Sequence, residues 1–467
     1  MYENENEMIE ETESLEEEVA RLLSGRCFSS LRSRLAEEKP ADIAELIAGL
    51  SEEERLPVYR LLSKDAAAEV LVELDADAQR ELIEAFSDWE LREVLSQLYS
   101  DDTAALTEEM PDNFVRRILN NCPPELRHSV NQLLQYPEGS AGSMMTTEYV
   151  RLKAEMTVDD AFSHIRRVAL DKETVYNCYV TSADKRLIGI VSVRAMLLCE
   201  PSALIGDIME ENIVSVNTHE EREQVARLFD KYGYLALPVV DKDEHIVGII
   251  TVDDALEVIG EETEEDFSKM AAITPTPDIP YLRLSPFTLF KSRIPWLLLL
   301  MLGATFTGLI IASFESALAA SVVLTAFIPM IMGTGGNSGS QASVTVIRGL
   351  SLGEIERGDA IKVFWKELRV SVLCGVCLAV FNYGKMLLID GLMMQNPDVT
   401  PLVSLTVSLT LCVTVVCAKL IGCALPILAK RLRLDPAVMA SPFITTAVDA
   451  ISLLVYFAIA KSLLHLP

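Results

Sequence analysis

The chain has 467 residues, half of them hydrophobic, and a formal net charge of −29 at pH 7. The charge is uneven, because residues 1–270 contain 59 acidic and 26 basic side chains, whereas residues 271–467 contain 10 and 14. An acidic surface repels nucleic acid and concentrates cations, so this composition argues against nucleic acid as a partner.

The first 40 residues form an acidic lead-in that we expect to be mobile. Their start has neither the basic segment nor the apolar run of a cleaved signal peptide, so we expect this part of the chain to stay in the cytoplasm. Nine cysteines show no disulfide framework or zinc spacing. The CxxC pair of Cys374 and Cys377 lies in an apolar stretch and is predicted to serve packing.

Residues 51–134 divide without a gap into seven units of twelve residues. The units open on helix-starting residues such as Ser, Asp or Pro and close on apolar residues, which is typical of a short helix and a turn. Such units bury their faces only on each other. We therefore predict an all-α helical-repeat domain over residues 41–136.

Two segments, 145–198 and 209–256, share one order of predicted elements: a strand that starts near a Met, an amphipathic helix, a β-hairpin and a second helix. This order resembles a tandem pair of CBS domains, α/β regulatory modules that bind adenine nucleotides or ions, here at residues 137–200 and 201–262. Thr251 and Asp254 have the spacing that holds a ribose, which makes ATP a candidate ligand, but Ala195 replaces the acid in the first half.

An acidic run and a proline-rich stretch lead from the CBS pair to the apolar part of the chain. We predict a linking helix over residues 263–290 that couples the front to the membrane. The prolines of this stretch, which make a chain stiff and extended, are Pro275, Pro277, Pro280 and Pro286.

Residues 291–467 are predicted to form an all-α membrane domain with five helices, so the fold class is a multi-domain membrane protein. Five stretches are long and apolar enough to cross a bilayer: 294–313, 316–340, 368–389, 402–425 and 437–464. Basic residues, including Arg357, flank alternate ends of these stretches. The positive-inside rule then places the N-terminus in the cytoplasm and the C-terminus outside.

Asp449 lies about twelve residues into the last stretch, where an acid facing lipid costs about 2.5–3.5 kcal/mol on insertion scales. Lys385, Asp390, Lys419 and Lys461, in contrast, are expected near helix ends, where they reach the interface. We predict that Asp449 lines an ion pathway. The structural alternative is a buried acid bonded to the hydroxyls of Thr445 or Thr446.

Residues 329–343, PMIMGTGGNSGSQAS, are rich in glycine and small polar residues. We predict opened backbone that faces a cavity, with Asn337 and Gln341 inside it. The alternative is close helix packing through small residues. In residues 435–449, Pro442 is expected to free carbonyl groups, while Ser441 and Thr445 offer further oxygen ligands.

Oxygen ligands without His or a well-placed Cys favour Mg²⁺, Ca²⁺ or Mn²⁺ over Zn²⁺ or Cu⁺. One carboxylate per chain is few for Ca²⁺ but suits Mg²⁺, which keeps several waters. A two-fold dimer would place two Asp449 side chains around one hydrated ion. The chain shows no nucleophile, acid–base pair or phosphate loop, so we do not expect an enzyme.

The order of domains, with GGNSGSQ and DPAxxxxPxxTTxxD, resembles the MgtE family of Mg²⁺ channels over nearly the whole chain after residue 40. The resemblance implies a homodimer in the cell membrane, with the pore at the subunit interface. It also implies cytoplasmic domains that bind Mg²⁺ and close the pore when internal Mg²⁺ is high.

Carried over by position, the resemblance implies that Asp449 selects the ion and that Asn337 lines the pore. It assigns regulatory Mg²⁺ to a set of acids, Glu69, Asp101, Asp254, Glu262, Glu265 and Asp266, and it adds Asp435 as an acid that joins the linking helix to the pore mouth. The chain departs from the family pattern at Ala105, Gly233, Ser441 and Ser452, which leaves open the number of regulatory ions and the selectivity among divalent cations.

Two alternatives remain open at the level of sequence. One is an ion-coupled carrier, or a channel for Mn²⁺, Co²⁺ or Ca²⁺. The other is a membrane-anchored adenine-nucleotide sensor whose helices only anchor and dimerise, although it explains neither the deep acid nor the segment 329–343.

Overall fold

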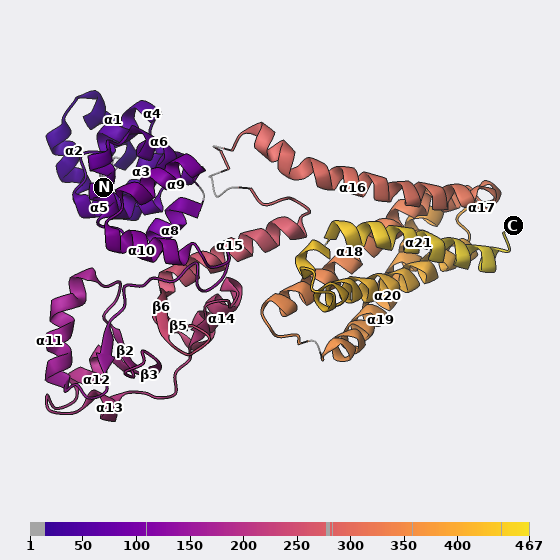
Figure 1. Ribbon diagram of the computed structural model, residues 1–467. Helices are drawn as coiled ribbons and strands as arrows, with labels where there is room; N and C mark the ends of the chain where they lie inside the picture. The colour runs from indigo at the N-terminus through magenta and orange to yellow at the C-terminus, as the bar shows by residue number, and fades with distance from the viewer. Residues whose placement is uncertain are drawn as a thin grey trace, which may run out of the picture. The chain divides into compact units, whose positions relative to one another are not determined.

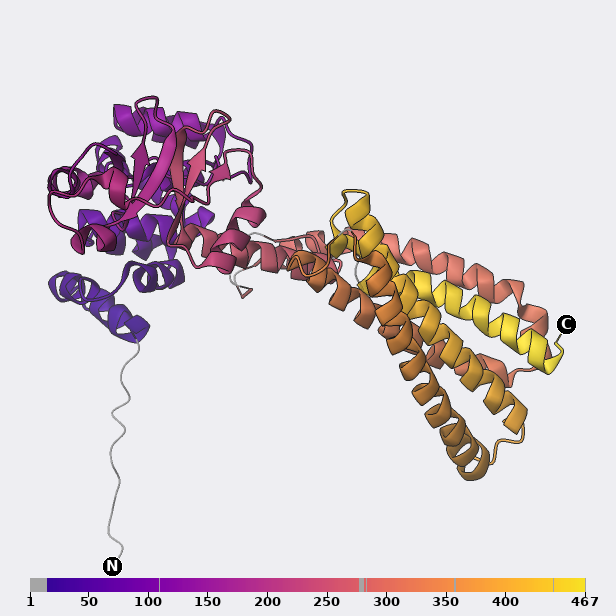
Figure 2. The same cartoon turned by 90° about the horizontal axis from the view of Figure 1, so that it is seen from below.

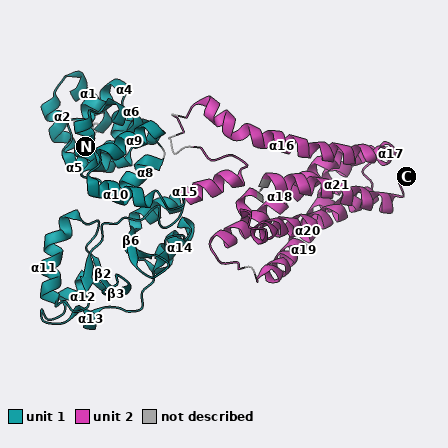
Figure 3. Cartoon of the chain, viewed as in Figure 1, with its two compact units in different colours: residues 1–260 teal, residues 261–467 magenta. Residues whose placement is uncertain are grey.

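The computed structural model describes residues 15–108, 110–276, 281–282, 284–356, 358–439 and 441–466. The chain forms two compact units, residues 1–260 and 261–467 (Figure 3). Residues 1–14 of the predicted lead-in, together with Pro277, Pro280 and Arg357, lie outside the described residues.

The first unit begins with ten short helices, α1 to α10 (Figure 1). Each predicted twelve-residue unit contains one of the seven helices α4 to α10. Their bounds are α1 Leu15–Ser24, α2 Phe28–Leu35, α3 Pro40–Gly49, α4 Glu52–Tyr59, α5 Lys64–Glu73, α6 Ala76–Ala85, α7 Asp88–Leu95, α8 Ser100–Glu108, α9 Asp112–Asn121 and α10 Pro124–Leu133.

The expectation of a mobile lead-in is wrong for residues 15–35, which form α1 and α2. Val19 and Leu31 are fully buried in the same core as the repeat helices. The physical reason is amphipathicity: both helices have an apolar face that packs onto the repeat.

The helices of the repeat begin directly after the polar side chains that identified the repeat in the sequence. The side chain of Asp75 accepts a hydrogen bond from the backbone N–H of Ala78 at 2.9 Å. Ser87 accepts one from the N–H of Glu90 at 3.2 Å, and the Glu90 carboxylate accepts one from the N–H of Ser87 at 2.8 Å. These caps satisfy N–H groups that a helix end otherwise leaves unpaired.

Two three-stranded sheets follow, each with a parallel and an antiparallel pair of strands. The elements are β1 Arg151–Lys153, α11 Val158–Val168, η1 Ala169–Asp171, β2 Asn177–Thr181, β3 Leu187–Ser192, α12 Val193–Leu197, α13 Ile205–Ile208, β4 Val216–Asn217, α14 Arg222–Tyr232, β5 Ala236–Val240, β6 Ile246–Thr251 and α15 Val252–Met270. Both halves have the predicted order of elements.

Each half contributes its opening segment to the other half. Thr146 bridges to Ile249 in β6, and Glu210 bridges to Ile190 in β3. The accompanying methionines lie over hairpin glycines, Met145 over Gly248 and Met209 over Gly189. The two halves therefore form one interlocked module.

The second unit is a bundle of long helices that run alongside one another (Figures 1 and 2). Its elements are α16 Pro286–Ser313, α17 Glu315–Ala320, α18 Val323–Ser351, α19 Ala360–Lys385, the π-helical η2 Met386–Met393, α20 Pro401–Arg431, the 3₁₀ turn η3 Pro436–Met439 and α21 Ser441–Leu464.

Four stretches among the described residues are long and apolar enough to cross a membrane: Pro286–Ser313, Ala360–Met393, Pro401–Arg431 and Pro442–Leu464. The helix α18, which contains most of the second predicted span, is equally long but is not among them. Its glycines and polar residues lower its hydropathy. Length and composition alone therefore do not give the predicted number of five membrane-crossing helices.

The prediction of opened backbone at residues 329–343 is wrong, because α18 is a continuous helix across them. The glycines instead let helices approach closely. A Cβ at Gly335 would lie 2.8 Å from the Oγ of Ser452, and one at Gly339 would lie 3.1 Å from the carbonyl oxygen of Ala418. The break in this region falls earlier, between α17 and α18.

The prediction for Lys419 is also wrong. It is the nineteenth residue of the 31-residue α20, and it is only 6% exposed. The packing of α20 against α18, α19 and α21 covers a residue that a reading of one helix alone would leave at the interface.

Candidate ion pathway and sensor sites

Asp449 lies in the third turn of α21 and is partly buried. The hydroxyls of Thr445 and Thr446 both donate to the carbonyl of Pro442, at 2.9 and 3.0 Å. Within the described part of the chain, the Asp449 carboxylate has no hydrogen bond or ion pair. The structural alternative, an acid held by these two hydroxyls, therefore does not describe this site.

The role predicted for Pro442 changes with these contacts. Pro442 lies in the first turn of α21, where a missing N–H does not break a helix, and its carbonyl accepts the two threonine hydroxyls. It lies at the start of the helix, so its missing N–H opens no hydrogen bond within α21. The side chain of Ser441 lies outside what the structure describes.

Helices α18 and α21 pack antiparallel, since Gly335 meets Ser452 whereas Gly339 meets Ile444. A Cβ at Gly336 would lie 3.1 Å from the Cγ2 of Thr445. This register brings Asp449 level with the α18 turns around Gly335. The contacts hold the Asp449 turn against the small-residue segment that the sequence singled out.

Asn337 and Gln341 lie one turn apart on α18, and both are exposed in the single chain. Gly333, one turn before Asn337, has open space where a Cβ would be. The helix thus packs its buried glycines inward and presents a small, polar stripe outward. Ser452, a departure from the family pattern, is 1% exposed, and its Oγ has no hydrogen-bond partner among the described residues.

A cluster of carboxylates lies in the first unit, where α8 meets the CBS pair and the start of α15. The structure brings the predicted acids Asp101 and Asp254 together there, as the effect of Asp254 on the pKa of Asp101 indicates. Three further acids that the sequence did not indicate belong to this front cluster, Asp102, Glu148 and Glu173, and Asp253 lies close enough to raise the pKa of Asp102 and of Glu173.

The front cluster is short of positive charge. Burial first, and then neighbouring carboxylates, raise the pKa of Asp102 to about 6 and that of Glu173 to about 8. Burial raises the pKa of Asp254 to about 6 although Thr251 hydrogen-bonds to it, and burial and the neighbouring acids also raise the pKa of Asp101. The buried Oε2 of Glu173 has no hydrogen-bond partner in the part of the chain that the structure describes. Such a group of oxygens fits a hard divalent cation.

Glu69 is not part of the front cluster: it is exposed on α5, and the carboxylates that act on Asp101 do not include it. Sequence reasoning missed Glu148 and Glu173, because they come from CBS loops far from α8 in the chain. The Glu148 carboxylate accepts the Ser100 hydroxyl at 2.7 Å, and this contact ties the loop to α8.

The end of α15 forms a second acidic site, entirely within the second unit. The ammonium of Lys269 lies 2.6 Å from Glu265 and 2.6 Å from Asp435. Asp266 accepts the hydroxyl of Ser351, at the end of α18, at 3.2 Å. Three predicted sensor acids, Glu265, Asp266 and Asp435, thus lie at the end of the bundle that is predicted to face the cytoplasm. Glu262 lies one turn earlier on α15 and also has an interaction partner.

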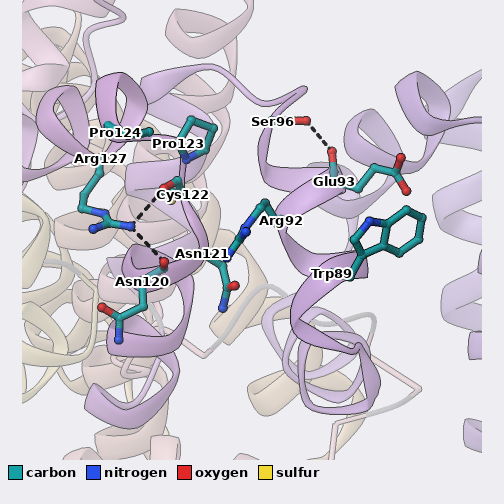
Figure 4. A pocket seen from close by; sticks show the side chains of 10 residues that line it. All are labelled: Trp89, Arg92, Glu93, Ser96, Asn120, Asn121, Cys122, Pro123, Pro124 and Arg127. Carbon is teal, nitrogen blue, oxygen red and sulfur yellow. Dashed lines mark hydrogen bonds between the residues drawn. The ribbon is translucent and has the colours of Figure 1, made fainter.

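Two other features lie outside these sites. A pocket of about 600 Å³ between α7, α9 and α10 is lined by Trp89, Arg92, Glu93, Ser96, Asn120, Asn121, Cys122, Pro123, Pro124 and Arg127, and none of the predicted site residues is among them (Figure 4). The hairpin of the second CBS half gathers Asp241, Asp243 and His245, but Asp241 already bonds His245 at 3.0 Å.

The architecture defines a class: a membrane protein with a helical-repeat domain, a CBS pair and a helical bundle containing a deep acid. Family models match the chain as an MgtE intracellular N domain at residues 38–139, CBS domains at 141–199 and 205–261, and a divalent cation transporter, MgtE, at 328–459. The chain belongs to the MgtE family.

Two relatives align along nearly their whole length. The magnesium transporter MgtE of Thermus thermophilus is 37% identical over 440 residues, covering 93% of this chain and 95% of the relative. The magnesium transporter MgtE of Bacillus subtilis is 32% identical over 444 residues, covering 95% of this chain and 96% of the relative. Both are named as transporters rather than enzymes.

A solved structure, the cytosolic domain of the Mg²⁺ channel MgtE in complex with ATP, is 38% identical to the chain with a TM-score of 0.50. The match covers 52% of this chain and 100% of that structure. The likeness extends the family assignment to the fold of the matched half of this chain.

Proposed function

We propose that this protein is a Mg²⁺-selective channel that imports Mg²⁺ down its electrochemical gradient. The observation that carries the proposal is the carboxylate of Asp449 in the apolar helix α21, which no described side chain pairs. An acid in such a place is costly unless it is paired or faces water, and a hydrated ion pathway supplies that water. The names of the two relatives support Mg²⁺ as the ion.

In this proposal α18 is the fifth membrane-crossing helix. Its small polar stripe, with Asn337 and Gly333, faces the pathway rather than lipid, which explains why it is less apolar than the other four helices. A second copy of the chain covers the stripe, so that two Asp449 carboxylates share one hydrated ion. The N-terminus then lies in the cytoplasm and the C-terminus outside, with the protein in the cell membrane.

Regulation in this proposal is by cytoplasmic Mg²⁺. The front cluster offers hard oxygen ligands in a place where like charges crowd, and the acids at the end of α15 offer further oxygen ligands beside Lys269. A bound divalent cation relieves that repulsion and draws the carrying segments together, which closes the pore. Conversely, when internal Mg²⁺ falls, the carboxylates of the front cluster repel one another and the segments that carry them separate.

Uptake of Mg²⁺ by proteoliposomes tests the pathway. Asp449→Asn keeps the side-chain volume and removes the charge, so we expect it to lose flux while the protein remains monodisperse. Asp398→Asn, in the exposed connection before α20, is the matched control and should retain flux. Full flux through Asp449→Asn would overturn the assignment. Dependence on a Na⁺ or H⁺ gradient would instead indicate a carrier.

Binding of an adenine nucleotide by the CBS pair is a second proposed activity, supported by the ATP complex of the related cytosolic domain. Asp254, the acid predicted to hold a ribose, also belongs to the front cluster and accepts from Thr251. Equilibrium binding of ATP with and without Mg²⁺ tests it. An Asp254→Asn variant that binds ATP as the wild type does would remove Asp254 from the nucleotide site.

A further inference from the structure

The last turns of α15 contain one lysine among several acidic residues. The helix contains eight Asp and Glu residues but a single basic one, Lys269. Its ammonium lies 2.6 Å from the Oε1 of Glu265, one turn earlier, and 2.6 Å from the Oδ2 of Asp435, on the connection between α20 and α21. One side chain thus bridges two separate parts of the unit.

The bridge is held in place on both sides. The other oxygen of Asp435 accepts the backbone N–H of Ala437 at 2.8 Å, which fixes the carboxylate at the start of η3. The neighbouring Met270 packs against Ile347 and the buried Ala437. The three charged side chains are partly shielded, with 23%, 37% and 34% exposure for Lys269, Glu265 and Asp435.

These contacts make the ammonium a strong local counter-charge. The ammonium lies within 2.6 Å of a carboxylate oxygen on each side, and both contacts favour its charged form. The group is therefore fully charged in the cell. Oxygens held at this distance from a fixed ammonium have no room for a second cation between them.

We propose that Lys269 is a tethered competitor of the regulatory cation and sets the Mg²⁺ concentration at which the pore closes. Glu265 and Asp435 release the ammonium when they take up the divalent ion, and they recapture it when internal Mg²⁺ falls. This inference rests on the proposed regulation by cytoplasmic Mg²⁺. It adds a residue that is not itself a ligand to the acids proposed above.

The competition fixes the sign of a substitution. Without the ammonium, the two carboxylates repel each other and bind Mg²⁺ more readily. Lys269→Gln should therefore lower the internal Mg²⁺ concentration for half-inhibition, by about threefold to tenfold for a partly shielded ion pair. Lys269→Arg keeps the charge and should stay within about twofold of the wild type.

Patch-clamp recording of the full chain, with internal Mg²⁺ varied, measures this threshold. The control is Lys153→Gln, an exposed lysine on β1, which should leave the threshold unchanged. If Lys269 were only a clamp that holds the closed state together, its loss would raise the threshold. A raised or unchanged threshold in Lys269→Gln overturns the inference.

A second measurement does not depend on channel activity. The full-length protein is treated with an amine-acylating reagent, and the modification of each lysine is followed by mass spectrometry. Mg²⁺ should speed the acylation of Lys269 several-fold over protein in EDTA, because the released amine becomes accessible, while Lys153 and an equal ionic strength of NaCl show no change. A Lys269 rate that Mg²⁺ leaves unchanged or slows refutes the competition.

The two measurements separate this inference from the proposed function. A wild-type channel that internal Mg²⁺ does not inhibit would remove the regulatory proposal, and the acylation rate would still decide whether a divalent ion displaces Lys269. Inhibition of the wild type without either effect at Lys269 would leave the regulation standing and remove the inference.

Discussion

Gly422 of α20 and Gly339 of α18 meet backbone to backbone. A Cβ at Gly422 would lie 3.0 Å from the carbonyl carbon of Gly339 and would overlap its oxygen. The contact explains why two of the longest helices approach so closely, because no side chain separates them. It also makes this crossing intolerant of even one methyl group.

Gly422→Ala should therefore destabilise the helical bundle. Overpacking of a tight core costs about 1–3 kcal/mol, and a clash with backbone belongs at the upper end of that range. The fraction of monodisperse protein after heating in detergent measures the loss. Gly384→Ala is the matched control, since nothing lies within 4 Å of its Cβ, and a similar loss there would contradict the packing explanation.

The interlocked CBS halves give a prediction about two equivalent glycines. A Cβ at Gly248 would lie 2.7 Å from the backbone oxygen of Thr146, whereas the three atoms nearest to a Cβ at Gly189 all belong to the side chain of Met209. Gly248→Ala should consequently lower the melting temperature more than Gly189→Ala. Equal losses of melting temperature would mean that the backbone at Thr146 moves aside as easily as the side chain of Met209.

The front cluster predicts how stability depends on pH. In the folded state the pKa values of Asp102 and Asp254 are about 6 and that of Glu173 is about 8, above their ordinary values of 3.8 and 4.5. The folded chain thus binds more protons than the unfolded chain between about pH 4 and 8, and the free energy of unfolding falls as the pH rises through that window.

We expect the metal-free protein to be more stable at pH 5 than at pH 8, by about 1–3 kcal/mol from this cluster. Mg²⁺ should stabilise it at pH 8 much more than at pH 5, because it binds the deprotonated carboxylates. Thermal unfolding of the full chain in EDTA and in Mg²⁺ measures both. The double variant Asp102→Asn, Glu173→Gln should flatten the pH dependence, and an unaltered slope would contradict this account.

The acids at the end of α15 give a prediction about gating. Replacement of Glu262, Glu265 and Asp266 by Gln, Gln and Asn should leave the pore open at high internal Mg²⁺, because the ligands that bring α15 to the bundle are gone. Recording open probability against internal Mg²⁺ measures the effect. Neutralising three exposed acids of the repeat domain, Asp42, Glu52 and Glu53, is the control, and unchanged inhibition in the first variant would remove the sensor.

Local patterns predicted the fold well where local chemistry decides it. Helix-capping residues such as Asp75 and Ser87 mark the repeat, and hairpin spacing marks the CBS halves. The error at residues 329–343 has a physical cause: small residues permit both opened backbone and close packing, and only the opposing Ser452 and Ala418 decide between them. Sequence periodicity does not contain that information.

The site was predictable only in part for a similar reason. Asp449 is identifiable because an acid is rare in an apolar helix, and Asp435 because it belongs to the same motif. Glu148 and Glu173 join the front cluster through loops, and Lys269 gains its role only when Asp435 lies beside it. Such residues are defined by tertiary contacts between distant segments.

The exchange of opening segments between the CBS halves has a consequence for how the module is built and inherited. Because Thr146 completes pairing at β6 and Glu210 completes it at β3, a chain cut between the halves leaves each with an open strand edge and an uncovered glycine. Each half thus depends on the other for part of its strand pairing and for the methionine that covers its hairpin glycine. We therefore expect duplication, truncation or domain shuffling to retain the two halves together as a pair. A mutation that disturbs one half should also destabilise the other.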